Sequence, residues 1–234
     1  MQPTGAEKQL LLIGASRGLG CALAEQYLQR GWHVVATHRS QGNSKLPALA
    51  KTHGGQLEIE TVDILYPEQV AALHARLGQR SFDMLFVNAG VKNDDSQTVA
   101  TVPTDEFVRV MVTNALSPMR VVEALQDRVA RCGTIAIMSS GQGSVTNNTN
   151  GNYEVYRASK AALNTLMRSF AARHAGESRT LLLMAPGWVR TDMGGPNGRL
   201  SIDESIPKLA NTIDAQAGRA GLQYLDYLGQ TVPW

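Results

Sequence analysis

Short, mostly apolar runs alternate with longer segments of helical period along most of this 234-residue chain. A strand that is apolar along its whole length must be covered on both faces of its sheet. Helices that carry the chain back to the same edge make neighbouring strands parallel. The alternation therefore predicts a parallel sheet between two layers of helices. The predicted strands are 10–13, 33–37, 57–62, 82–87, 134–138 and 180–185, and the predicted helices are 18–30, 45–53, 67–77, 104–130 and 155–175.

No Pro/Ser-rich linker, composition shift or internal repeat divides the chain. Hydrophobic residues make up 43% of it, which is enough for a sizeable core. We expect one α/β domain over residues 1–234, a single doubly wound parallel sheet of the Rossmann type. Two loop-like stretches, 139–154 and 192–200, follow predicted strands at the edge where such sheets bind ligands.

Charge and cysteine usage argue against several classes of protein. The 22 basic and 20 acidic residues are scattered and give a net charge of +2, so we expect no nucleic-acid partner. The apolar run 10–13 is too short for a signal peptide or a membrane span, which favours a cytoplasmic protein without a membrane partner. Only Cys21 and Cys132 are cysteines, placed in the first helix and at the end of a later one, and the five histidines are dispersed. We therefore expect neither disulfides nor a metal site.

A glycine-rich turn, GASRGLG, follows the first predicted strand directly and leads into a predicted helix. Glycine permits the tight turn and lets backbone N–H groups approach a pyrophosphate at the helix N-terminus. A turn that merely needs glycine is the alternative, but the strand before it and the helix after it favour dinucleotide binding. The candidate cofactor contacts here are Gly14, Ser16, Arg17, Gly18, Leu19 and Gly20.

The end of the second predicted strand favours NADP(H) over NAD(H). NAD enzymes of this fold generally place a carboxylate there for the ribose 2′-hydroxyl, whereas NADP enzymes place cations. This sequence reads Thr37-His38-Arg39-Ser40, without an acidic residue. Arg39 and Arg17 can form a cradle for a 2′-phosphate, with His38 and Ser40 beside it. Two solvated arginines on a loop are the alternative.

Tyr156 and Lys160 are spaced to share one face of the helix predicted at 155–175. Residues four apart on a helix are neighbours, so the ammonium group can lie near the phenol. An adjacent cation favours phenolate and lowers the pKa of a tyrosine. We therefore expect Tyr156 to exchange a proton with a carbonyl or alcohol oxygen. Alone, the pair also fits an ordinary exposed helix face.

Six motifs, in this order, resemble the short-chain dehydrogenase/reductase family. They are GASRGLG, Asn88-Ala89-Gly90, Asn114, Ser139-Ser140, YxxxK at 156–160, and Pro186-Gly187-Trp188-Val189-Arg190-Thr191. The resemblance covers nearly the whole chain and implies hydride transfer between NADP(H) and a small carbonyl compound or secondary alcohol. Within the family, the stretch from SSGQGS to YRASKAALN and the terminal TVPW are similar to the short carbonyl reductases related to C-factor and sniffer proteins.

The resemblance also implies roles for individual residues. Ser140 would orient the substrate oxygen, Lys160 would hold the nicotinamide ribose and assist Tyr156, and Asn114 would anchor a water that leads to the lysine. The stretch between Ser140 and Tyr156 is longer than is common in the family, so Ser144 is an alternative serine. The cofactor contacts implied are Asp63, Ile64, Asn88, Ala89, Gly90, Tyr156, Lys160, Pro186, Gly187, Val189 and Thr191.

Three positions within this pattern have simpler explanations or depart from it. Asp63 could instead cap the helix that begins near Pro67. Asn114 could be an ordinary polar residue beside a kink at Pro118. Val87 stands where the family's NNAG has its first asparagine, which removes a contact that stabilises the strand.

The resemblance implies a homodimer or homotetramer that pairs helices 104–130 and 155–175 across a two-fold axis. The second of these helices carries a stripe suited to close contact, although a monomer could bury the same stripe against its own sheet. The stripe consists of Ala158, Ala161, Ala162, Leu163, Leu166, Phe170 and Ala171.

Segments 141–154 and 192–207 are expected to wall the substrate site. Two other functions fit parts of the sequence. One is a redox sensor that binds NADP(H) and signals to a partner without turnover, although such proteins typically lose the tyrosine or the lysine. The other is a different Rossmann enzyme, such as a methyltransferase, which would lack YxxxK.

Overall fold

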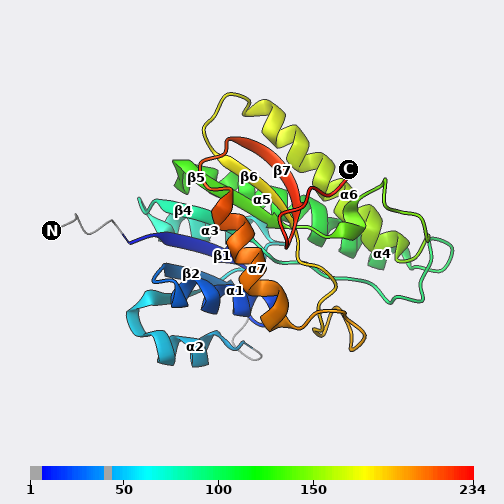
Figure 1. The fold of residues 1–234 in the computed structure, drawn as a ribbon, viewed down its shortest axis with the longest axis horizontal. Coiled ribbons are helices and arrows are strands. Elements are labelled where there is room, and N and C mark those ends of the chain that lie inside the picture. The colour runs from blue at the N-terminus through cyan, green and yellow to red at the C-terminus, as the bar shows by residue number, and fades with distance from the viewer. Residues whose placement is uncertain (1–6, 40–43) are drawn as a thin grey trace.

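The computed structural model describes residues 7–39 and 44–234, and these form one seven-stranded parallel sheet (Figure 1). The strand order is β3-β2-β1-β4-β5-β6-β7, and every neighbouring pair is parallel. The order reverses between β1 and β4, which opens a crevice at the carboxyl ends of the central strands. The predicted doubly wound sheet is confirmed. The strands are β1 (Gln9–Ile13), β2 (His33–His38), β3 (Leu57–Thr61), β4 (Phe82–Val87), β5 (Val129–Met138), β6 (Thr180–Ala185) and β7 (Gly221–Asp226).

Helices cover both faces of the sheet (Figure 1). One core packs α1, α2 and α7 on one face, and the other packs α3, α5 and α6 on the opposite face. In residues 7–39 and 44–234, no helix combines the length and apolar character needed to cross a membrane. The helices are α1 (Gly18–Gln29), α2 (Leu46–His53), α3 (Pro67–Leu77), α4 (Thr104–Met111), α5 (Ser117–Leu125), α6 (Glu154–Arg173) and α7 (Ile202–Ala215).

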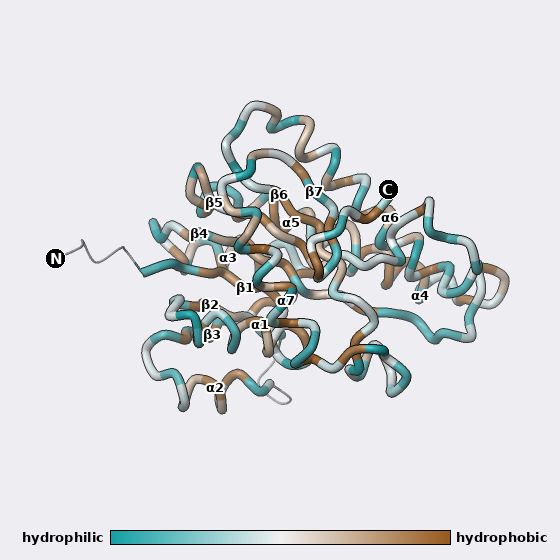
Figure 2. Tube along the Cα trace, in the orientation of Figure 1, coloured by the Kyte–Doolittle hydropathy of each residue, from teal (hydrophilic) through white to brown (hydrophobic). Residues whose placement is uncertain are grey.

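The central strands are mostly apolar because they contribute to both cores. In β1, Leu11 and Ile13 face the core under α3, α5 and α6, whereas Leu10 and Leu12 face the core under α1, α2 and α7. Side chains alternate between the two faces of a strand, so both sets are removed from water. Figure 2 shows hydrophobic segments gathered within the sheet and its covering helices, with more hydrophilic stretches around them.

The prediction of a single helix at 104–130 is wrong in detail. The structure divides it into α4, a π-helical turn at Val112–Leu116 and α5, which ends at Leu125. Pro118 lacks the amide hydrogen that an α-helix would donate to the Asn114 carbonyl. The helix therefore widens into a single π-helical turn just before the proline. Strand β5 begins at Val129, earlier than predicted, and Cys132 therefore lies on a strand and not at a helix end.

Helix α7 and strand β7 were not predicted, and the expected substrate loop at 192–207 is wrong beyond residue 201. A capping box starts α7 there: the Ser201 hydroxyl accepts from the Glu204 amide, and the Glu204 carboxylate accepts from the Ser201 amide. This pairing satisfies N–H groups that a helix start leaves without partners. The chain therefore becomes helical midway through the expected loop.

The small-residue stripe on α6 is divided between the chain's own core and its surface. Leu163 and Phe170 are buried in the core of α3, α5 and α6, and Ala162 and Ala171 pack against it. Leu166 is 39% exposed. Much of the stripe thus serves the chain's own packing, and the homodimer or homotetramer stays a prediction.

Candidate active site

A cavity of about 1160 Å³ runs along the carboxyl ends of the strands. Its wall is built by segments at the ends of all seven strands, together with the first turns of α6. All the predicted site residues line it except Gly20 and Asn114, and Ser40, which lies outside the described residues. The structure thus brings together predicted site residues that are up to 177 positions apart in the sequence, from Gly14 to Thr191.

The glycine-rich turn is fastened to two neighbouring strands. The Gly14 amide donates to Thr37 Oγ1 over 3.0 Å, and the Ala15 amide donates to the Thr37 carbonyl over 2.7 Å. From the far side, Asn88 Nδ2 donates to the Gly14 carbonyl over 2.7 Å. These contacts fix the turn where β1, β2 and β4 end.

The start of α1 is suited to an anionic group. Arg17, the N-cap residue, makes no side-chain hydrogen bond to the helix amides. A Cβ added at Gly18 would meet no atom within 4 Å, so the backbone there faces open space in the cavity. Free amides and the helix dipole at such an end favour a phosphate. The turn therefore fits the pyrophosphate of a dinucleotide.

The part of the cavity lined by His38, Arg39 and Arg17 contains the cationic side chains that were predicted to bind a 2′-phosphate. His38 is buried and Arg39 exposed, and both line the cavity with Arg17. Among the described residues, His38 Nδ1 is buried without a hydrogen-bond partner. Arg17 Nη1 lies 2.7 Å from the carboxylate of Asp192, on the segment after β6. An ion pair that the sequence did not predict thus links the glycine-rich turn to the segment facing it.

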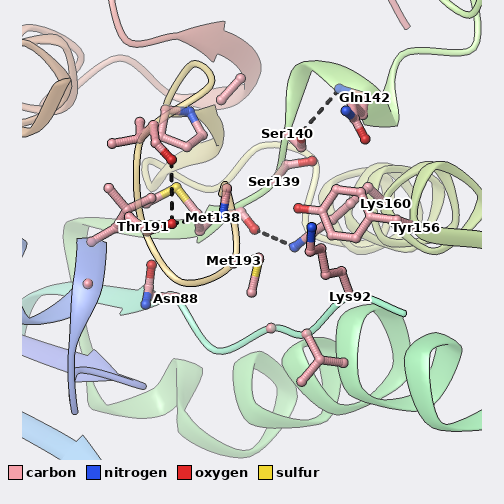
Figure 3. A pocket seen from close by; sticks show the side chains of 18 of the residues that line it. Asn88, Lys92, Met138, Ser139, Ser140, Gln142, Tyr156, Lys160, Thr191 and Met193 are labelled. Atoms are coloured by element: carbon pink, nitrogen blue, oxygen red, sulfur yellow. Dashed lines mark hydrogen bonds between the residues drawn. The ribbon is translucent and has the colours of Figure 1, made fainter. Parts of the chain in front are cut away.

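Tyr156, Lys160 and Ser140 meet at one end of the cavity (Figure 3). The nearby Ser140 hydroxyl lowers the pKa of Tyr156, but the larger effect of burial raises it to about 12. Lys160 Nζ donates to the Met138 carbonyl over 2.9 Å and lies 5.9 Å from the centre of the Tyr156 ring. The expectation that the adjacent cation lowers the pKa of Tyr156 is wrong for this arrangement, because burial of the phenol dominates the shift and Lys160 is not among its causes.

Lys160 is 3% exposed, and burial lowers its pKa to about 8. The unfolded chain therefore binds the proton more tightly between about pH 8 and pH 10.5, and the cost of burying the ammonium is largest below pH 8 and fades as the pH rises. We expect wild type to gain about 2 kcal/mol of unfolding free energy relative to Lys160→Met between pH 7 and pH 10. Urea unfolding of both proteins across this range measures it. A constant difference would contradict the pKa shift.

Ser140 faces the cavity and Ser144 does not. Ser140 Oγ accepts the Gln142 amide over 3.1 Å, which leaves its own proton available to the phenol and to the cavity. Ser144 is buried, and its Oγ accepts the Asn147 amide over 3.1 Å. The geometry therefore favours Ser140 over Ser144 as the serine that meets a ligand.

Asn114 is fully buried and ties two elements together. Its side chain accepts from the Val91 amide, donates to the Val91 carbonyl over 2.7 Å and donates to Ser159 Oγ over 2.9 Å. It does not line the cavity, and a Cβ at Gly90 would lie 3.3 Å from Asn114 Oδ1 and 3.6 Å from Lys160 Nζ. In this structure Asn114 joins the segment after β4 to α6. Its partner on α6, Ser159, is the residue directly before Lys160.

Asp63 and Thr191 both line the cavity as predicted. The Asp63 carboxylate accepts from the Leu65 amide over 3.0 Å, and the N-cap of α3 is Tyr66. The simpler explanation of Asp63 as the helix cap is therefore wrong. Thr191 Oγ1 accepts the Gly194 amide over 3.0 Å, which shapes the segment after β6.

The wall at the end of β7 was not predicted from the sequence. Six residues there line the cavity, and Asp192 and Met138 also take part in its contacts. The sequence offered one signal, the terminal TVPW, which marked a resemblance and pointed to no site. The six residues are Asp226, Tyr227, Gln230, Thr231, Val232 and Pro233.

Residues 8–199 match the family of the short chain dehydrogenases. A structure from Burkholderia multivorans, described as a short-chain dehydrogenase/reductase with bound NADP, is 58% identical with a TM-score of 0.96, over 97% of this chain and 100% of that one. A carbonyl reductase from Pseudomonas aeruginosa PAO1 in complex with NADP is 39% identical with a TM-score of 0.91, over 98% and 100% of the two chains.

The C-signal protein of Myxococcus xanthus is 36% identical over 154 residues, which cover 65% of this chain and 92% of that protein. The similarity to C-signal and to a carbonyl reductase agrees with the branch predicted from the motifs. A methyltransferase or another unrelated Rossmann enzyme is excluded by the family match. The fold, the six motifs and the matched residues lead to one conclusion: this chain belongs to the short-chain dehydrogenase/reductase family of oxidoreductases.

Proposed function

We propose that the chain transfers hydride between NADP(H) and a carbonyl compound or secondary alcohol, with Ser140, Tyr156 and Lys160 as its catalytic residues. The observation that carries this proposal is the meeting of these three side chains in one cavity, which the glycine-rich turn also lines. Two similar proteins bind NADP in their structures, which supports the choice of cofactor.

The bound cofactor would supply the hydride to a carbonyl carbon, or accept it from an alcohol. Ser140 would donate its free hydroxyl proton to the substrate oxygen and hold that oxygen beside Tyr156. Tyr156, whose pKa is raised to about 12, is protonated near neutral pH and would donate a proton to the same oxygen during reduction. The Lys160 ammonium would stabilise the phenolate that remains.

The cofactor would lie with its pyrophosphate at the start of α1 and its 2′-phosphate near Arg39 and Arg17. Asp63 and Asn88 flank the place expected for the adenosine and the central ribose, and Thr191 flanks the place expected for the nicotinamide end. The predicted contacts at Ile64, Ala89, Gly90, Pro186, Gly187 and Val189 line the wall between these points.

Arg39 is expected to set the preference for NADPH. Arg39→Ala should weaken NADPH binding by about 10- to 100-fold, because it removes a charge-assisted hydrogen bond to a phosphate, and should leave NADH binding nearly unchanged. Fluorescence titration of both nucleotides measures this. Arg120→Ala is a matched control, because Arg120 is an exposed arginine on α5 outside the cavity. Equal losses for NADPH and NADH would contradict a 2′-phosphate contact.

The proposal is tested first by titrating the protein with NADPH and NADH and then following nicotinamide absorbance with aldehydes, ketones and diketones. Binding of NADPH with turnover of any of these compounds supports a reductase. Tight NADPH binding without turnover across the panel would contradict it and favour the NADP(H)-binding sensor.

A further inference from the structure

Three consecutive residues at the end of β5 are each held by a side chain from elsewhere. The Met138 carbonyl accepts from Lys160 Nζ, and Ser139 Oγ donates to Asn164 Oδ1 over 2.7 Å. The Ser140 carbonyl accepts from the hydroxyl of Tyr224. Lys160 and Asn164 belong to α6, whereas Tyr224 comes from β7, two strands away from β5.

Tyr224 is fixed from several sides. It is 2% exposed and pairs with Leu183 of β6. Its carbonyl accepts the Val232 amide over 2.9 Å, and its ring centre lies 5.4 Å from that of Trp234. Burial raises the pKa of the Tyr224 phenol, so the hydroxyl stays protonated and can donate throughout the neutral range. Tyr224 does not line the cavity and reaches it only through its neighbours.

The Ser140 carbonyl has two donors, the Tyr224 hydroxyl and the Gly143 amide of the following turn, which lies 2.9 Å away. The next residues form a short 3₁₀ turn, Gly141–Gly143, in which a Cβ at Gly141 would meet no atom within 4 Å. Ser140 Oγ must accept the Gln142 amide and also reach the Tyr156 phenol. The orientation of the peptide plane that follows Ser140 affects both contacts. The oxygen of that plane is held by the Gly143 amide from within the turn and by the Tyr224 hydroxyl from β7.

We propose that Tyr224 is a positioning residue for the reaction: through its hydrogen bond to the Ser140 carbonyl, it aims the Ser140 hydroxyl at the substrate oxygen and at Tyr156. This inference rests on the function proposed above. Tyr224 acts through Ser140 and touches neither substrate nor cofactor.

Tyr224→Phe removes the hydroxyl and keeps the ring. Its matched control is Tyr27→Phe, because Tyr27 is fully buried and its hydroxyl donates to Asp214 between α1 and α7, outside the cavity. Both variants should lose similar stability in thermal unfolding. Tyr224→Phe should lower kcat about tenfold with NADPH affinity unchanged, whereas Tyr27→Phe should keep the wild-type kcat.

The double variant with Ser140→Ala tests whether Tyr224 acts through Ser140. We expect Tyr224→Phe to lower kcat no further when Ser140 is already alanine, because the group that it aims is gone. The same tenfold loss in both backgrounds would overturn the inference, as would equal kcat for Tyr224→Phe and Tyr27→Phe. A wild-type protein that binds NADPH and turns over no carbonyl compound would overturn the proposed function and this role with it. If the wild type is active and Tyr224→Phe has the same kcat as Tyr27→Phe, only the role of Tyr224 is overturned.

Discussion

Tyr156→Phe is expected to lower kcat by about 1000-fold while changing NADPH affinity little. Phenylalanine keeps the ring in its place and removes the proton that the substrate oxygen would receive, and a positioned acid contributes a factor of about 10² to 10⁴ to a rate. The neighbouring Lys160 directs its ammonium to the Met138 carbonyl and is not expected to replace the phenol as the acid. Little residual activity should therefore remain.

Steady-state kinetics at saturating NADPH, together with a separate nucleotide titration, measure both quantities. Tyr27→Phe again serves as the control for loss of a buried tyrosine hydroxyl. A comparable loss of turnover and of NADPH binding would show that Tyr156 is a structural residue. An unchanged rate would assign the proton transfer to another group.

The layers of the fold could be predicted because apolar periodicity reports local burial. The strands β1, β2, β4 and β6 place apolar residues in both cores, and each strand from β1 to β6 was expected near its observed position. Strand β7 lies at the edge of the sheet and includes Gln223 and Asp226, so it lacks that pattern. Its position is set by pairing with β6, a tertiary contact that no local window of sequence contains.

The site was predictable where a motif carries its own geometry. The glycine-rich turn and the YxxxK spacing each specify a local shape, and the structure places both on the cavity. The ion pair between Arg17 and Asp192 and the bond from Tyr224 to Ser140 join residues that are 175 and 84 positions apart. Such contacts depend on strand order and on loop paths, which the motifs do not specify.

The pKa of Tyr156 illustrates the same limit in energetic terms. The sequence shows a lysine at helical spacing and therefore predicts a lowered pKa. The structure adds the desolvation of both groups, which raises the pKa of Tyr156 and lowers that of Lys160. Segments distant in sequence surround Lys160, among them the end of β5 and the turn at Gly143, and the spacing of the pair does not encode them.

Gly20→Ala is expected to destabilise the fold by about 4 kcal/mol, since an added methyl group here has no room and no soft neighbour. Its Cβ would lie 2.3 Å from the Gly14 carbonyl oxygen, 2.6 Å from Asn88 Nδ2 and 3.0 Å from Ala15 Cα. Two of these atoms are backbone, and the third is the amide that fastens the Gly14 carbonyl to β4. Relief therefore requires α1 to move away from the sheet.

The displacement would break the bond from Asn88 to Gly14, and so it would also distort the turn proposed to hold the pyrophosphate. Urea unfolding should show the loss of stability, and NADPH affinity measured well below the midpoint should fall in parallel. Gly55→Ala is the matched control, because a Cβ there would meet no atom within 4 Å and the residue is exposed. That variant should unfold at or slightly above the wild-type midpoint, since alanine restricts the unfolded chain. If Gly20→Ala matched Gly55→Ala in both measurements, the close packing of α1 against the glycine-rich turn would not be needed for the fold or for the cofactor site.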